Sequence, residues 1–171
     1  LLGARNGSLA NQALYGLIVR SINPAIVGDS QATIPTPAAN APFLLLVALI
    51  VGLSAWLVWR RHLWRMPWEA TSLLICTLLL IMPVSWDQYQ TLLLLPLLVG
   101  AAHTMRAAER PSLLLMAAYA LLAFGMIKNL WQGDTPLTTF GLLFMAYRTL
   151  GLGLLWGWWL RYALRLPRCS A

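Results

Sequence analysis

The sequence has few charged residues. They make up 10% of its 171 positions, and only five of them are acidic, against twelve basic ones. A soluble domain carries about 25% charged residues, so this composition argues against a soluble globular protein. A net charge of +7 would favour nucleic acid as a partner of a soluble chain. In so apolar a chain we expect no nucleic-acid partner.

Cysteines and motifs typical of catalytic or metal-binding sites are also scarce. Of the two cysteines, Cys76 lies inside an apolar run and Cys169 lies in a basic tail, so the pair indicates no disulfide framework. The sequence contains no glycine-rich phosphate loop, no Cys/His set with metal-ligand spacing and no nucleophile elbow. We therefore expect no metal ion and no other bound cofactor.

Long apolar blocks are abundant. Hydrophobic residues make up 60% of the chain, and each block approaches the roughly 20 residues that a helix needs to cross a bilayer. We predict an all-α, polytopic membrane protein whose residues 42–160 form a bundle of about five transmembrane helices. The predicted spans are 42–59, 68–84, 87–105, 111–127 and 137–160.

The loops between these spans alternate in charge. Those after the first, third and fifth spans hold eight arginines, whereas the opposite loops hold one lysine, Lys128. Positive residues accumulate on the cytoplasmic side. We therefore predict a multi-pass protein of the inner or plasma membrane, with 1–41 outside and 161–171 as a basic cytoplasmic tail. His62 and His103 fall near the cytoplasmic side, where we expect loop or interface roles. Seven tryptophans are predicted at the cytoplasmic interface: Trp56, Trp59, Trp64, Trp68, Trp156, Trp158 and Trp159.

The segment "LANQALYGLIVRSI" (9–22) predicts a short amphipathic helix. Its Leu14, Leu17 and Ile18 share one face by their i, i+3, i+4 spacing. It is too short and too polar to span a bilayer, which indicates an interfacial or re-entrant helix on the outer side. The alternative is a surface helix with no catalytic or binding role, and periodicity alone favours this alternative.

A polar turn separates the second and third predicted spans. Its Asp87 could simply cap the third helix, because a carboxylate at a helix N-terminus is stabilised by the helix dipole and the free N–H groups. A surface turn does not need Trp86, Gln88 and Tyr89 around such a cap. The same cluster could form the floor of a site for a polar ligand, and both interpretations stay open.

Arg148 lies about a dozen residues into the fifth predicted span. A charge at that depth costs at least ~2.5 to 3.5 kcal/mol on insertion scales. The side chain either faces the bundle interior or a wet cavity and pairs with an anion, or the helix begins later than predicted. Gly151 and Gly153 would permit close approach of a neighbouring helix.

Two stretches resemble motifs of glycosyltransferase family 87. The stretch "NQALYGLIVR" (11–20) is similar to its Asn-Gln-Ser-Leu-x-Gly…Arg element, and "MPVSWDQYQTLLLLPLL" (82–98) to its Ser-Pro-x-Ser-Trp-Asp-His-Tyr element. Their order and their separation of about 70 residues match the C-terminal half of the family, and the resemblance covers roughly residues 5–160.

The resemblance implies a GT-C membrane glycosyltransferase. Members of this family transfer a sugar, typically mannose, from a polyprenyl-phosphate donor to an envelope lipid or glycan acceptor outside the cytoplasmic membrane. Their catalytic base is expected in the first extracytoplasmic loop. That loop belongs to an N-terminal half of the same protein, so we expect this chain to be incomplete and to lack the base. Gln88 stands where the family has His, and Gln cannot take up a proton as His can.

The resemblance also implies roles for individual side chains. Asp87 and Gln88 would support catalysis by positioning the sugar or the acceptor. Arg20 and Arg148 are candidates for contacts to the donor phosphate, because a guanidinium binds phosphate through two parallel hydrogen bonds. The other predicted substrate-binding residues are Asn11, Gln12, Tyr15, Trp86 and Tyr89, the three aromatic ones as stacking surfaces.

Two alternatives stay open. A transporter or flippase-like subunit would use Arg148 and the polar turn to line an outer cavity, but the inverted repeats common in transporters are not visible. A purely structural membrane subunit would account for the apolar helices, but it would leave the buried arginine and the polar turn unexplained.

Overall fold

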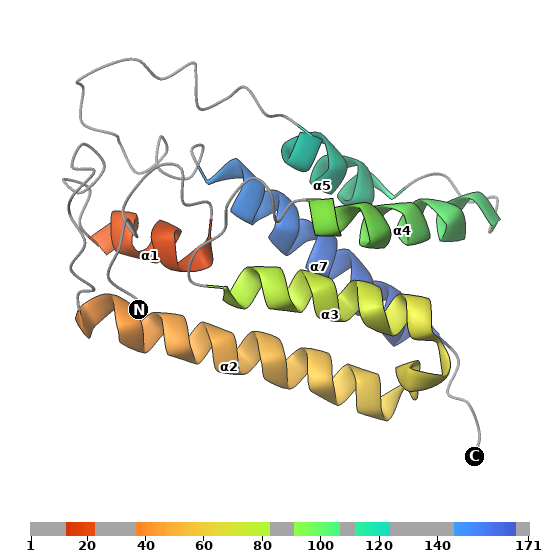
Figure 1. The fold of residues 1–171 in the computed structure, drawn as a ribbon, viewed down its shortest axis with the longest axis horizontal. Coiled ribbons are helices and arrows are strands. Elements are labelled where there is room, and N and C mark those ends of the chain that lie inside the picture. Colours follow the sequence, from red (N-terminus) through yellow and green to blue (C-terminus); the bar gives the residue numbers. More distant parts are fainter. Residues whose placement is uncertain (1–12, 23–36, 83–90, 107–111, 124–145, 167–171) are drawn as a thin grey trace.

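Helices make up every regular element of the part that the structure describes. A computed structural model describes residues 13–22, 37–82, 91–106, 112–123 and 146–166, and the all-α prediction is confirmed for these ranges (Figure 1). The elements are α1 (Leu14–Ile22), α2 (Pro37–Arg60), the short 3-10 helix η2 (Leu63–Arg65), α3 (Pro67–Ile81), α4 (Leu94–Arg106), α5 (Leu113–Ala123) and α7 (Tyr147–Arg165).

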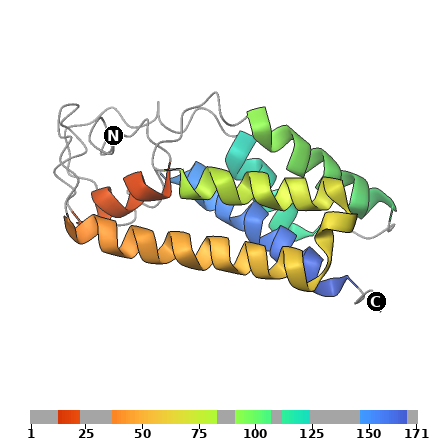
Figure 2. The same ribbon diagram turned by 60° about the horizontal axis from the view of Figure 1, so that its bottom comes forward.

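The long helices run alternately in opposite directions, so the bundle has two distinct ends. At one end, here called the η2 end, α2, α4 and α7 finish and α3 and α5 begin (Figures 1 and 2). At the other, the α1 end, α2 and α7 begin and α3 ends near the short helix α1, whereas the shorter helices α4 and α5 do not reach it (Figures 1 and 2). This alternation is the arrangement that the loop charges predicted.

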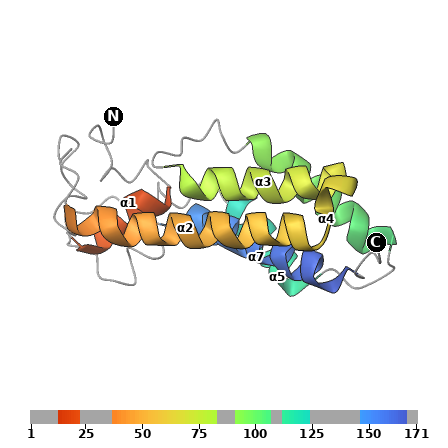
Figure 3. The same cartoon turned by 90° about the horizontal axis from the view of Figure 1, so that it is seen from below.

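Helix α2 buries a single narrow stripe. Its buried residues recur with a period near 3.6, which places them on one face: Ala39, Phe43, Ile50, Ser54 and Leu57. Most of the rest of its surface is apolar and exposed, and Figure 3 shows α2 in the foreground, with α1 and α7 behind it. The large exposed side chains of α2 are Leu44, Leu45, Leu49, Val51, Leu53, Trp56 and Trp59.

One helix of the described part, Ala38–Arg60, is long and apolar enough to cross a membrane. The segments 67–81, 91–106 and 113–123 are apolar but shorter, at 10 to 17 residues. The first of the five predicted spans thus meets the criterion of length and composition within the described ranges, and the other four stay predictions.

Helix α7 forms the centre of the bundle and packs against α5, α3 and α2. Its Trp158 and Trp159 are buried in the main core, at 6% and 1% exposure. Their predicted place in an interfacial belt was therefore wrong, because their rings fill the space between helices. Of the other predicted belt residues, Trp56, Trp59, Trp64 and Trp68 are all exposed. Trp156 is half-buried, and its indole is bonded to Ser54 inside the bundle.

A chain of hydrogen bonds crosses the middle of the core from α7 to α3. The indole Nε1 of Trp156 donates to Ser54 Oγ at 3.0 Å, and Thr77 Oγ1 donates to the Leu73 carbonyl at 2.9 Å. Since the Thr77 proton is used in that bond, Ser54 donates to Thr77 across 2.7 Å. Each buried polar group in the chain thus has a partner, as burial requires.

Candidate functional site

Helix α1 docks onto the first turns of α2. The Tyr15 hydroxyl donates to Asn40 Oδ1 at 2.8 Å, and the Tyr15 ring meets the Phe43 ring edge-on, with centroids 4.9 Å apart. Tyr15 is 0% exposed, and burial raises the pKa of its phenol. A stacking role for Tyr15 would therefore require α1 to move away from α2.

The buried face of α1 differs from the predicted apolar face. The buried residues are Tyr15, Gly16, Val19 and Arg20, whereas Leu14, Leu17 and Ile18 are half-buried. The predicted helix is present, but its packing is set by Tyr15 and Val19, which are one turn apart and both belong to the small core formed with α2.

Arg20 is enclosed by the protein, with 0% of its surface exposed. Burial lowers the pKa of its guanidinium to about 10, because the charged form loses hydration. The side chain therefore keeps its positive charge near neutral pH. A cation held at this depth raises the affinity of its surroundings for anions, since charges interact more strongly where water is excluded.

Arg148 lies in the first turn of α7, which begins at Tyr147. The described helix thus starts later than the predicted 137, and Arg148 is near a helix end rather than a dozen residues inside a helix. Its guanidinium carbon lies 5.7 Å from the centroid of the buried Tyr147 ring, within cation–π distance. The half-buried side chain belongs to the α1 end of the bundle.

Six of the nine predicted site residues lie outside the described ranges: Asn11, Gln12, Trp86, Asp87, Gln88 and Tyr89. The described parts that border them can be compared. Leu14, in the first motif, and Met82, the first residue of the second, both pack against the main core cluster, and α1 contacts α3. Helix α1, which carries most of the first motif, thus contacts the helix that ends directly before the second motif.

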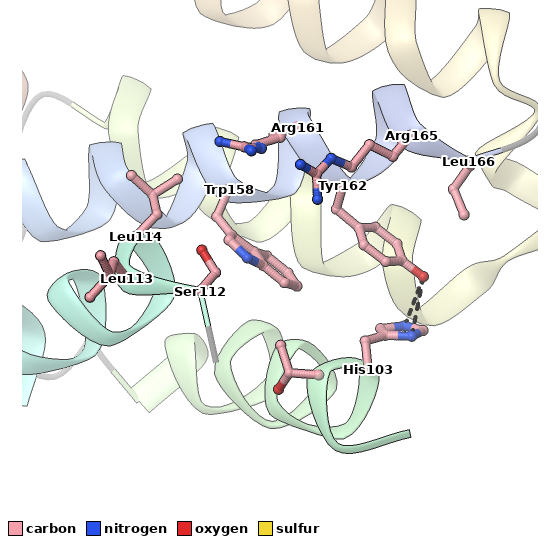
Figure 4. Close-up of a pocket in the computed structure, with 10 residues that line it drawn as sticks. His103, Ser112, Leu113, Leu114, Trp158, Arg161, Tyr162, Arg165 and Leu166 are labelled. Carbon is pink, nitrogen blue, oxygen red and sulfur yellow. Dashed lines mark hydrogen bonds between the residues drawn. The ribbon is translucent and has the colours of Figure 1, made fainter. Parts of the chain in front are cut away.

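A second polar cluster, which the sequence did not reveal, lies at the η2 end (Figure 4). His103 Nε2 in α4 is 2.9 Å from Glu69 Oε1 in α3, and His103 Nδ1 is 3.1 Å from the Tyr162 hydroxyl in α7. In the neutral imidazole, Nε2–H donates to the carboxylate and Nδ1 accepts from the phenol. The cluster ties three helices together.

The only sequence signal for this cluster was that polar residues occur near one end of three predicted spans. Glu69 begins the second, His103 ends the third and Tyr162 follows the fifth. Among the described residues, no group of three or more His, Cys, Asp and Glu side chains could hold a metal ion.

A scan of the chain against protein-family models found no match, and neither did searches for similar curated proteins and similar solved structures. The resemblance to glycosyltransferase family 87 therefore depends on the two motifs, and what it implies remains a prediction.

Proposed function

We propose that this chain is the C-terminal part of a polytopic membrane glycosyltransferase. It would move a sugar, mannose by the family resemblance, from a polyprenyl-phosphate donor to an envelope lipid or glycan acceptor on the extracytoplasmic side. The observation that carries the proposal is the contact of α1, which holds most of the first motif, with α3, which ends directly before the second, although the motifs are about 70 residues apart in sequence.

The exposed surface of α2 supports a membrane location. Large apolar side chains cover most of this helix outside its buried stripe, among them Leu45 at 72% and Trp59 at 72% exposure. A soluble monomer rarely exposes a contiguous apolar surface of this extent, whereas a bilayer accepts it. With 24 residues and a rise of 1.5 Å per residue, α2 is ~36 Å long, enough to cross the roughly 30 Å hydrocarbon core.

The arginines support an orientation. Six of the eight described arginines lie at the η2 end, and two, Arg20 and Arg148, lie at the α1 end. By the positive-inside rule the η2 end faces the cytoplasm. The α1 end then faces outward, the side on which polyprenyl-phosphate sugars are used in the family that the motifs resemble.

The chemistry needs a cationic environment for the departing phosphate. Cleavage of the donor leaves negative charge on a polyprenyl phosphate, which positively charged groups stabilise as it develops. Arg148 is half-buried in the first turn of α7 and is our candidate for direct contact through its guanidinium fork. Arg20 is fully enclosed and contributes the field of its charge. Asp87 and Gln88 hold the sugar or the acceptor.

Transfer from radiolabelled polyprenyl-phosphate mannose in membranes that carry the natural protein tests this proposal. We expect Arg148→Ala and Asp87→Ala each to lower turnover at least ~10²-fold, the scale reported for loss of one charge-stabilising group. Arg65→Ala is the matched control, because Arg65 is exposed at the opposite end, and it should leave turnover unchanged.

Undiminished turnover in both the Arg148→Ala and Asp87→Ala variants would refute the assigned roles. Passage of the labelled donor through proteoliposome membranes without sugar transfer would instead favour a transporter.

A further inference from the structure

A cavity of about 690 Å³ lies at the η2 end, between α4, α5 and α7 (Figure 4). Small-ligand pockets commonly measure roughly 300 to 1,000 Å³, so this one has room for a headgroup-sized molecule. It lies at the opposite end of the bundle from α1 and the start of α7, which carry the described residues of the predicted transfer site, Tyr15, Arg20 and Arg148 (Figure 1). The lining combines cations, hydroxyl groups and apolar side chains.

Two arginines give the cavity its charge. Arg161 and Arg165 line it together with Trp158 and Tyr162, and the i, i+3, i+4, i+7 spacing of these four residues places them on one face of α7. Figure 4 shows both guanidinium groups on the side of the helix that carries the two rings. Like charges one turn apart repel each other, and a bound anion would remove that repulsion.

No carboxylate lines the cavity within the described ranges. The one described carboxylate, Glu69, is engaged by His103 Nε2 at 2.9 Å. Among the lining residues that the structure describes, the two arginines therefore have no acidic neighbour to neutralise their positive charge. A phosphate group matches such a pair of forked donors, since each guanidinium can offer two parallel hydrogen bonds.

The rings form a fixed wall. Trp158 and Tyr162 are stacked, with centroids 5.6 Å apart and planes 14° from parallel. The Tyr162 hydroxyl is held by His103 Nδ1 at 3.1 Å, and Trp158 is buried. The side of the cavity beneath the arginines is thus positioned before any ligand binds, which lowers the ordering cost of binding.

The rim is apolar on the α5 side. Leu113 is 84% exposed and lines the cavity beside Leu114, with the Ser112 side chain between them and the rings (Figure 4). An acyl chain attached to a phosphate in the cavity could lie against these leucines. Basic pockets between transmembrane helices on the cytoplasmic side commonly bind anionic lipid headgroups.

The geometry points to a binding site for a phosphoester anion at the η2 end, held by Arg161 and Arg165. The ligand is either the headgroup of an anionic phospholipid or a soluble phosphate ester, which share this chemistry. The site is independent of the proposed sugar transfer, and loss of one activity leaves the other in place.

The test uses the full chain in nanodiscs and compares phosphatidylglycerol with phosphatidylcholine as the added lipid, with bound lipid counted by native mass spectrometry. We expect at least tenfold tighter retention of phosphatidylglycerol, and at least a tenfold loss of it in the Arg161→Gln/Arg165→Gln pair. Each single substitution should lower the retention of phosphatidylglycerol about threefold, and these single variants keep the test valid if the double variant does not fold.

The control pair is Arg60→Gln/Arg106→Gln. It removes the same charge at the same end from residues that do not line the cavity, and it should retain phosphatidylglycerol like the unmodified chain.

Competition distinguishes the two sources. Displacement of the lipid by millimolar glycerol 3-phosphate identifies a site for soluble phosphate esters, and retention of the lipid identifies a lipid site. Equal losses in the two pairs, or binding of neither probe, would overturn the inference, whatever the sugar-transfer assay shows.

Discussion

Gly151 of α7 packs against Leu121 of α5 with no room for a side chain. A Cβ atom at Gly151 would lie 2.9 Å from Leu121 Cβ and 3.3 Å from the Ala118 carbonyl oxygen. A Cβ at Gly153 would meet no described residue within 4 Å. The predicted close approach of a neighbouring helix is therefore confirmed at Gly151, whereas the described helices make no such approach at Gly153.

The Gly151→Ala substitution should separate α5 from α7. We expect the free energy of unfolding to fall by ~1 to 3 kcal/mol, the usual cost of overpacking. Gly153→Ala is the matched control and should be neutral or raise stability by up to ~1 kcal/mol, because Ala favours helix more than Gly. Thermal unfolding in detergent measures both, and equal effects of the two substitutions would contradict the packing.

Arg61 holds the C-terminal end of α7. Its Nη2 donates to the Leu164 carbonyl at 2.7 Å and its Nη1 to the Leu166 carbonyl at 3.0 Å, where the last carbonyls of a helix lack partners within the helix. Arg61→Ala should lower the free energy of unfolding by ~1 kcal/mol and speed amide hydrogen exchange in the last turn of α7. Arg60→Ala is the matched control and should change neither stability nor exchange, because Arg60 lies over the Trp56 ring instead. Unchanged amide exchange in Arg61→Ala would refute the contact.

Ser54 links α2 to both α7 and α3. Ser54→Ala removes the acceptor of the Trp156 indole and the donor to Thr77. We expect a loss of ~1 to 2 kcal/mol in the free energy of unfolding, since hydrogen bonds between membrane helices average ~0.6 kcal/mol and a buried donor is left unpaired. The control is Thr71→Ala, because Thr71 is exposed on α3. Thermal unfolding that shifts equally in both variants would count against the hydrogen-bond chain.

The helical class and the alternation of helices could be predicted from apolar blocks and loop charges, but helix starts could not. Helix α2 begins at Pro37 rather than at the predicted residue 42. Pro42 does not mark the start, because so near the beginning of a helix its missing N–H costs one hydrogen bond at most. Helix α4 begins at Leu94 rather than 87, which puts Pro96 in its first turn, where proline is tolerated. A helix can begin at or just before a proline, and the sequence alone does not select the residue.

Contacts between helices were the harder part of the prediction. Glu69, His103 and Tyr162 lie on three helices, and no periodic pattern along one helix connects residues so far apart in sequence. Trp158 and Trp159 could not be assigned to the core, because an aromatic residue near the end of a span suits either the core or the membrane interface. The face of α1 that packs on α2 likewise depends on contacts between the two helices, and the periodicity of α1 alone does not show them.

Cysteine labelling from one side of the membrane tests the central claim, which is that the α1 end faces outward and the η2 end faces the cytoplasm. Cys76 and Cys169 are first replaced by Ala. Single cysteines are then placed at Ser21, which is exposed near the C-terminus of α1, and at Arg65, which is exposed at the η2 end.

With a membrane-impermeant maleimide on intact cells or spheroplasts, we predict that Ser21→Cys is labelled and that Arg65→Cys is labelled only after permeabilisation. Labelling of Arg65→Cys in intact cells, with Ser21→Cys reached only after permeabilisation, would contradict the account.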